Sequence, residues 1–322
     1  MKRLTGYVSD FFRHINKKSF VIISLLTAVA VFLNYYFSGL ETTILHADDK
    51  FLRFTWFLIL YALIFISSYL VIFNNRNDFR DQGTLSQIKS NANQLPQLSA
   101  FHIILVVLVP MIFALRMASG FVTSPLTKFL DYPLNNYFSI ILNAPLKCLI
   151  LLLFLRFIKT KGGYTHSITG LRSGSLSLKP FFIIIALFIP VIFLAGMQPD
   201  FAKVYPRFKH IAFIFPYTSL PWITAVMYEV SYVFDFVFTE AFFRGFLVLA
   251  FIRYVGPSAI LPMAALYCAV HFGKPLAECV SSYFGGIILG IISYRTGSVL
   301  GGLVLHLGIG ILMEIAGYLW TR

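Results

Sequence analysis

The stretch TEAFFRGFL, residues 239–247, places Glu240 and Arg244 inside a long apolar run. Four residues apart, the carboxylate and the guanidinium share one face of a helix. Two later apolar stretches carry one histidine each: LYCAVHFGKP (266–275) contains His271, and LVLHLGIG (303–310) contains His306. Ionisable side chains are costly at membrane depth, so they mark a site unless they pair with one another for structure. Three helices can therefore bring a carboxylate, a guanidinium and two imidazoles to one buried site.

The composition predicts a membrane protein. Hydrophobic residues make up 58% of the 322 and charged residues only 12%, whereas a soluble domain carries roughly 25% charged residues. The mean hydropathy of +0.79 agrees. Helices that cross a bilayer satisfy their own backbone hydrogen bonds. We therefore expect an all-α, polytopic transmembrane bundle of about 8–10 membrane-embedded helices.

Apolar windows of about 20 residues locate these helices. They lie near 20–39, 54–74, 101–118, 136–157, 180–197, 210–254, 257–272, 276–295 and 298–320. The window 210–254 is long enough for two helices, and PYTSLP at 216–221 is the expected break because proline disfavours helix in the residue before it. The first window is too long for a signal peptide and reads as a transmembrane helix. The three cysteines of the chain have no metal-ligand spacing, and the sequence shows no internal repeat.

Basic residues gather in the N-terminal segment and in the 74–99 and 156–180 loops. Such loops are typical of the cytoplasmic side and contact anionic lipid, so the net charge of +13 needs no nucleic-acid partner. We expect an integral, multi-pass protein of a bacterial inner membrane. Residues 1–175 would supply N-terminal transmembrane helices, and residues 176–322 would carry the site.

Polar residues punctuate the helix around Glu240 at intervals of three to five. This stripe, which must face the bundle interior, comprises Glu229, Tyr232, Asp235, Thr239, Glu240 and Arg244. One interpretation is a buried Glu240–Arg244 ion pair that only holds helices together. The other is that the two histidines join this pair in a functional site.

Further groups could belong to the same site. Glu278 follows His271 by seven residues, across a Gly–Lys–Pro break. A carboxylate in the first turn of a helix is favoured by the helix dipole, and a second acid near the site is the alternative interpretation. His306 has Gly302 and Gly310 one turn to either side, where small residues permit close helix packing and leave space beside the imidazole.

These motifs resemble the CPBP family of intramembrane proteases, which includes the CAAX prenyl endopeptidases of the Rce-one type. The resemblance covers roughly residues 220–315 and includes the order and spacing of all three motifs. The family pattern reads Glu-Glu-x-x-x-Arg, then Phe-x-x-x-His, then His-x-x-x-Asn or Asp. It implies that Glu240, Arg244, His271 and His306 are site residues.

The chain departs from the family pattern at three positions. Thr239 stands where the family has its first glutamate, the one usually assigned as catalytic, and Gly310 stands at the Asn or Asp position. Tyr267 replaces the phenylalanine of the second motif. The first two departures fall on positions that the family uses for chemistry.

The resemblance implies hydrolysis of a peptide bond by an activated water. In that reaction Glu240 is expected as base, His271 as the group that positions the water, and His306 as donor to the oxyanion, with Glu278 as an auxiliary carboxylate. No cofactor is expected. The alternative is zinc held by Glu240, His271 and His306, a three-ligand set, although an H-E-x-x-H motif is absent from the sequence.

Three classes of function remain open. The first is an intramembrane endopeptidase that acts on a membrane-associated protein or peptide in the lipid bilayer. The second is a catalytically silent scaffold of the same fold that binds or protects a partner, and Thr239 and Gly310 favour it. A transporter is disfavoured because the polar residues cluster in one half and no repeat is present.

Overall fold

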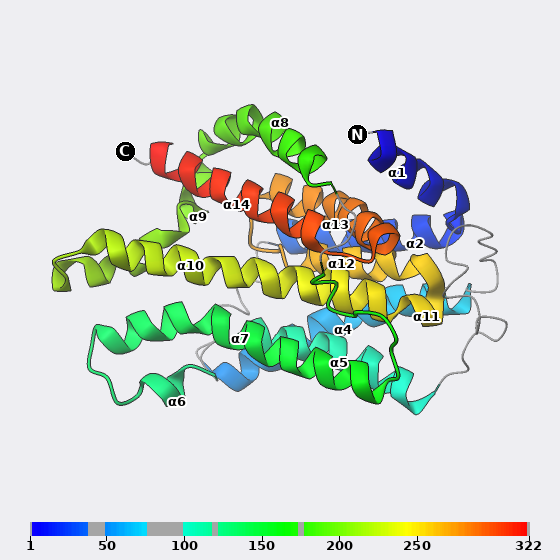
Figure 1. Ribbon diagram of the computed structural model, residues 1–322, viewed down its shortest axis with the longest axis horizontal. Helices are drawn as coiled ribbons and strands as arrows, with labels where there is room; N and C mark the ends of the chain where they lie inside the picture. Colours follow the sequence, from blue (N-terminus) through cyan, green and yellow to red (C-terminus); the bar gives the residue numbers. More distant parts are fainter. Residues whose placement is uncertain (1, 38–48, 76–98, 118–121, 173–176, 321–322) are drawn as a thin grey trace.

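A computed structural model describes residues 2–37, 49–75, 99–117, 122–172 and 177–320 (Figure 1). Across these ranges the chain is helical and no strand occurs, which confirms the all-α prediction. Eight segments in them are long and apolar enough to cross a membrane, so this is an integral, multi-pass membrane protein. The helices are α1 (Lys2–His14), α2 (Lys17–Tyr36), α4 (Lys50–Asn74), α5 (Ala100–Met117), α6 (Ser124–Thr127), α7 (Leu134–Lys161), α8 (Lys179–Gly196), α9 (Pro199–Val204), η3 (Arg207–Tyr217), α10 (Pro221–Glu240), η4 (Ala241–Ala250), α11 (Ile252–Val255), η5 (Gly256–Ala259), α12 (Ile260–Ala269), α13 (Leu276–Thr296) and α14 (Leu300–Trp320).

The predicted windows agree with the observed spans to within a few residues at most ends. PYTSLP is the break that was expected, because η3 ends at Tyr217 and α10 begins at Pro221. Proline is favoured at the first helical position, where its missing N–H has no partner to lose. Three short helices lie outside the predicted windows: α1, α6 and α9. The predicted 74–99 connector falls almost wholly outside the described residues.

Helix α10 continues without interruption into η4, a π-helix. This change of helix type falls between Glu240, the last residue of α10, and Arg244 in η4. All ten residues of η4 are buried. π-Helical turns are rare and occur often at functional sites. Here the π-helix begins directly after Glu240 and contains Arg244.

One apolar core joins helices from both halves of the sequence. Its members include Phe57 of α4, Phe113 of α5, Leu155 of α7, Phe242 of η4 and Leu261 of α12. Figure 1 shows α10 along the middle of the molecule, with α7 and α14 on either side of it, and both helices contact α10. The division at residue 175 stays a prediction.

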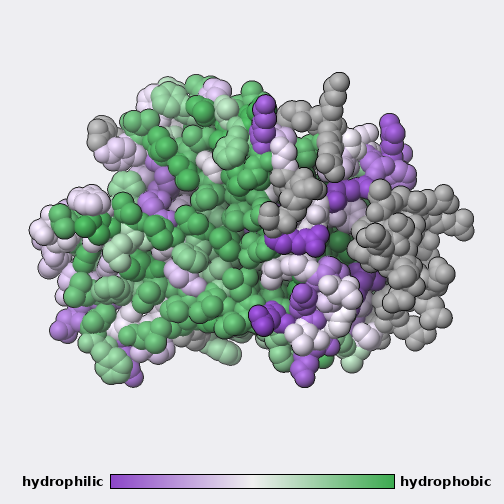
Figure 2. All heavy atoms as spheres, in the orientation of Figure 1, coloured by the Kyte–Doolittle hydropathy of each residue, from purple (hydrophilic) through white to green (hydrophobic). Residues whose placement is uncertain are grey.

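The face of the bundle in Figure 2 is apolar over most of its area. Hydrophilic side chains gather toward the end where Figure 1 places α1 and α11. Exposed large side chains such as Leu63 of α4, Leu153 of α7 and Leu187 of α8 stand on outward helix faces. These faces suit contact with lipid hydrocarbon, as the predicted bilayer environment requires. The three cysteines are buried and form no disulfide.

Candidate functional site

Glu240 and Arg244 form the ion pair that the sequence predicts. The Arg244 Nη1 atom lies 3.1 Å from Glu240 Oε1, and both side chains are fully buried. The guanidinium carbon also lies 4.0 Å from the ring centre of Tyr267. The pair therefore balances its own charge inside the protein, and the Tyr267 ring adds a cation–π contact.

His306 joins this pair from α14. Its Nδ1 atom lies 3.0 Å from Glu240 Oε1, and its Nε2 atom lies 3.1 Å from the Tyr267 hydroxyl. Gly302, one turn earlier on α14, makes room for the carboxylate, because a Cβ atom there would stand 2.6 Å from Glu240 Oε2. A chain of polar contacts thus runs from Glu240 through His306 to Tyr267.

His271 lies in the turn between α12 and α13. Its Nδ1 atom lies 2.8 Å from the main-chain oxygen of Tyr267, so Nδ1 carries the hydrogen and donates it, and Nε2 has a free lone pair. Burial, aided by the positive charge of Lys274, holds the pKa of His271 well below its usual range. The imidazole is therefore neutral at neutral pH.

A cavity of about 430 Å³ opens beside the two histidines. His271, His306, Tyr267 and Thr239 line it, whereas Glu240 and Arg244 are not among its lining residues. The wall of the cavity thus separates the ion pair from the open space of the cavity. The structure brings four predicted residues together as neighbours, Glu240, Arg244, His271 and His306, but only the histidines reach the cavity.

Thr239 and Gly310, the two departures at positions that the family uses for chemistry, each have a distinct environment in the structure. Thr239 faces the cavity, and its hydroxyl donates to the main-chain oxygen of Asp235 at 2.8 Å. At Gly310, a Cβ atom would stand 2.4 Å from the Phe236 ring. The Phe236 ring also contacts His306 edge to face, with centroids 4.9 Å apart. An aromatic ring therefore fills the space into which a side chain at position 310 would project.

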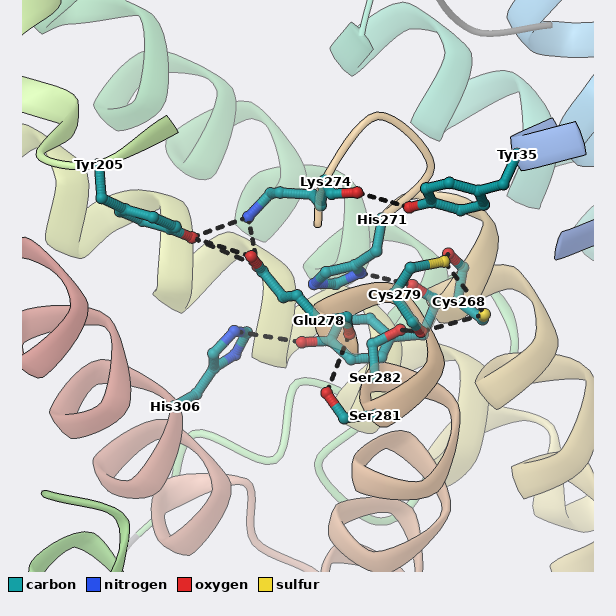
Figure 3. A network of polar contacts seen from close by, with 11 residues as sticks. Tyr35, Tyr205, Cys268, His271, Lys274, Glu278, Cys279, Ser281, Ser282 and His306 are labelled. Atoms are coloured by element: carbon teal, nitrogen blue, oxygen red, sulfur yellow. Dashed lines mark hydrogen bonds and ion pairs between the residues drawn. The ribbon is translucent and has the colours of Figure 1, made fainter. Parts of the chain in front are cut away.

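Glu278 forms its ion pair with Lys274, whereas Arg244 pairs with Glu240. The Glu278 Oε1 atom lies 2.6 Å from Lys274 Nζ, and the Tyr205 hydroxyl approaches both carboxylate oxygens at 3.3 and 3.4 Å. Figure 3 shows Lys274 reaching toward both Tyr205 and Glu278. Burial raises the pKa of Tyr205, so its hydroxyl stays protonated. Glu278 thus holds Lys274 beside the cavity, and its auxiliary catalytic role stays a prediction.

The alternative zinc set does not fit this arrangement. Over the part of the chain that the structure describes, no group of three or more His, Cys, Asp or Glu side chains is placed to hold a metal ion. Glu240 lies behind the cavity wall, and both ring nitrogens of His306 already have partners, Glu240 and Tyr267. We derive no step through a metal.

Residues 221–312 match the family model of the Rce1-like type II CAAX prenyl endopeptidases. The match runs from the start of α10 into α14, a range that carries all three motifs, and leaves the first two thirds of the chain unmatched. It confirms the resemblance that the motifs indicated. No curated protein and no solved structure matches the chain.

Several cavity residues were not singled out as site residues from the sequence. Tyr267 was noted only as a departure from phenylalanine, yet its hydroxyl meets His306 and its main-chain oxygen meets His271. Arg116 and Lys147 also line the cavity. A signal for them existed, since each is a cation inside an apolar window, and such residues are functional candidates by position alone.

Proposed function

We propose that this protein is an intramembrane endopeptidase that hydrolyses a peptide bond in a membrane-associated polypeptide. The observation that carries the proposal is a neutral imidazole, His271, with its Nε2 atom free beside a cavity of about 430 Å³. The family match supports the reaction class. A bacterial inner membrane as its location belongs to the same proposal.

In the proposed reaction His271, not Glu240, is the general base. A water in the cavity gives a proton to His271 Nε2 as its oxygen attacks the scissile carbonyl. The same proton then passes to the leaving amine as the carbon–nitrogen bond breaks. A lowered pKa keeps the base unprotonated at neutral pH, which is the state this step requires.

Tyr267 is the proposed oxyanion donor, and His306 is its positioning residue. Glu240 Oε1 lies 3.0 Å from His306 Nδ1 and fixes the orientation of the imidazole ring. His306 Nε2 in turn holds the Tyr267 hydroxyl at 3.1 Å beside the cavity. In the proposed reaction the Tyr267 O–H turns from the imidazole to the oxyanion, where a preorganised donor stabilises the developing negative charge.

A silent scaffold is the second candidate, and one observation favours it. No glutamate is among the described residues that line the cavity, because Thr239 occupies the position where the family has its catalytic glutamate. Under this candidate the cavity would bind a partner's polypeptide and leave it intact. The two candidates differ in a single measurable property, which is cleavage.

The test uses purified full-length protein and two fluorescence-quenched peptides, one ending in a prenylated CAAX sequence and one identical but unprenylated. Wild type should cleave at least one of them. His271→Ala and His306→Ala should each lower the rate by roughly 10² to 10⁴-fold. His210→Ala, at an exposed histidine outside the cavity, is the matched control and should cleave as wild type does. Equal rates for all four proteins would contradict the proposal.

A further inference from the structure

Four cationic side chains line the cavity. They come from separate parts of the fold: Arg116 from α5, Lys147 from α7, Arg207 from the start of η3 and Lys274 from the turn after α12. Among the described lining residues, Asp235 is the single carboxylate. Uncompensated positive charge in a membrane protein is costly and marks a path or a binding site for an anion.

Two of these cations already have acidic partners. Arg116 forms an ion pair with Asp235. Lys274 Nζ lies 2.6 Å from Glu278 Oε1. Each of these pairs is locally neutral, and neither needs a ligand to offset its charge.

Among the described residues, no carboxylate forms an ion pair with Lys147 or Arg207. Lys147 Nζ donates to the main-chain oxygen of Arg116 at 2.6 Å, which leaves its charge in place. Glu314 accepts the main-chain N–H of Arg207 at 2.9 and 2.8 Å, but the structure shows no ion pair between the Arg207 guanidinium and a described carboxylate. The cavity therefore holds two cations that are not neutralised by contact.

The rest of the lining suits an amphiphile. Asn143 carries a buried carboxamide oxygen with no hydrogen-bond partner among the described residues, and turning the amide would present its NH₂ group instead. Phe113, Met117 and Phe236 supply apolar surface in the same cavity. A ligand with an anionic end and a hydrocarbon portion would satisfy both kinds of surface.

We propose that this cavity binds the phosphate monoester group of an amphiphile, with Lys147 and Arg207 as the two principal cationic contacts. A phosphate monoester carries about −1.5 to −2 charges at neutral pH, which matches two unpaired cations better than a singly charged carboxylate does. Arginine binds phosphate with a fork of N–H donors, and lysine binds it as a point charge. This proposal does not rest on peptide hydrolysis.

The test titrates full-length protein in neutral maltoside micelles with dodecyl phosphate, inorganic phosphate or dodecanoate, and measures binding by calorimetry. Dodecyl phosphate should bind at one site. Lys147→Gln and Arg207→Gln should each weaken binding about tenfold or more, since each removes a charged hydrogen-bond donor. Arg156→Gln, at an exposed arginine on the same helix as Lys147, is the matched control and should leave binding unchanged.

The titrations with the different ligands also distinguish a lipid phosphate from free inorganic phosphate. Equal binding of inorganic phosphate, with the same dependence on the two variants, supports a site for the phosphate group itself. Binding of dodecyl phosphate alone supports a lipid ligand. The proposal is overturned if neither phosphate binds, if both variants bind as wild type does, or if dodecanoate binds more tightly, as expected for a site that takes a peptide carboxylate.

A second measurement uses only the wild-type protein, so it does not depend on whether the variants fold. Solid-state NMR on protein with ¹⁵N-labelled lysine and arginine should show dipolar contacts between the ³¹P nucleus of bound dodecyl phosphate and side-chain nitrogens of both residue types. Absence of these contacts would overturn the proposal.

Discussion

Glu240 and His306 lie in contact, with Oε1 and Nδ1 3.0 Å apart, although 66 residues separate them in the chain. The carboxylate is fully buried, whereas the imidazole reaches the cavity. The glutamate is therefore a partner of the histidine and has no direct access to a substrate. Because the cavity wall separates Glu240 from the cavity, the proposed reaction uses His271, Tyr267 and His306.

The contact depends on Gly302. Gly302→Ala would place a Cβ atom 2.6 Å from Glu240 Oε2, and overpacking of this kind costs about 1–3 kcal/mol. Thermal unfolding in micelles should show that loss. Gly285→Ala on α13 is the control, because a Cβ atom there meets nothing within 4 Å. Equal stability of the two variants would mean that Glu240 moves freely.

The ion pair can be tested as a unit. Glu240→Leu and Arg244→Leu should each cost about 3–5 kcal/mol, because each leaves a buried charge without its partner. The double variant should be clearly more stable than either single one, since replacing both members of a buried pair is often near neutral. If the double variant folds but no longer cleaves peptide, the pair also supports the chemistry.

The Tyr267 hydroxyl should matter more for rate than for stability. Tyr267→Phe restores the residue type of the family motif and keeps the ring below Arg244. Loss of an oxyanion donor lowers kcat by roughly 10² to 10³-fold, with KM nearly unchanged. Steady-state kinetics on the cleaved peptide will measure this. A normal kcat would assign oxyanion stabilisation to another group.

His271 should make stability depend on pH. Its pKa is lowered in the folded protein, so below about pH 6.5 the unfolded chain binds a proton that the folded chain does not. The free energy of unfolding should therefore fall by about 1.4 kcal/mol per pH unit from that point down to the lowered pKa. Wild type should show this slope between pH 6.5 and 5, on the order of one proton. His271→Gln should lose it, and an unchanged slope would contradict a buried neutral imidazole.

Much of the fold could be predicted because membrane spans are long and apolar. Each window near 101–118 or 276–295 must form its own helix, since lipid offers the backbone no hydrogen bonds. Helices α1, α6 and α9 were missed, because short helices carry no such length signal. Their formation depends on packing that the sequence does not display.

The three motifs indicated which residues meet, but not which of them face the cavity. Thr239 and Glu240 are adjacent, and one residue turns a helix by about 100°. A rotation of α10 by about that angle would exchange their places, so only packing places Thr239 at the cavity and Glu240 behind it. Lys147 was visible as a cation in an apolar window, yet the neighbouring sequence does not show that Arg116 and Arg207 lie beside the same cavity.

The central claim is that the chain cleaves a peptide bond without a glutamate at position 239. The most direct measurement compares the cleavage rate of wild type with that of a triple variant, Thr239→Glu with Phe236→Ala and Gly310→Asn, in which the Phe236 ring no longer fills the space beside position 310. The account predicts that wild type cleaves, and that His271→Ala abolishes this activity. An inert wild type beside an active triple variant would contradict it and leave a silent scaffold.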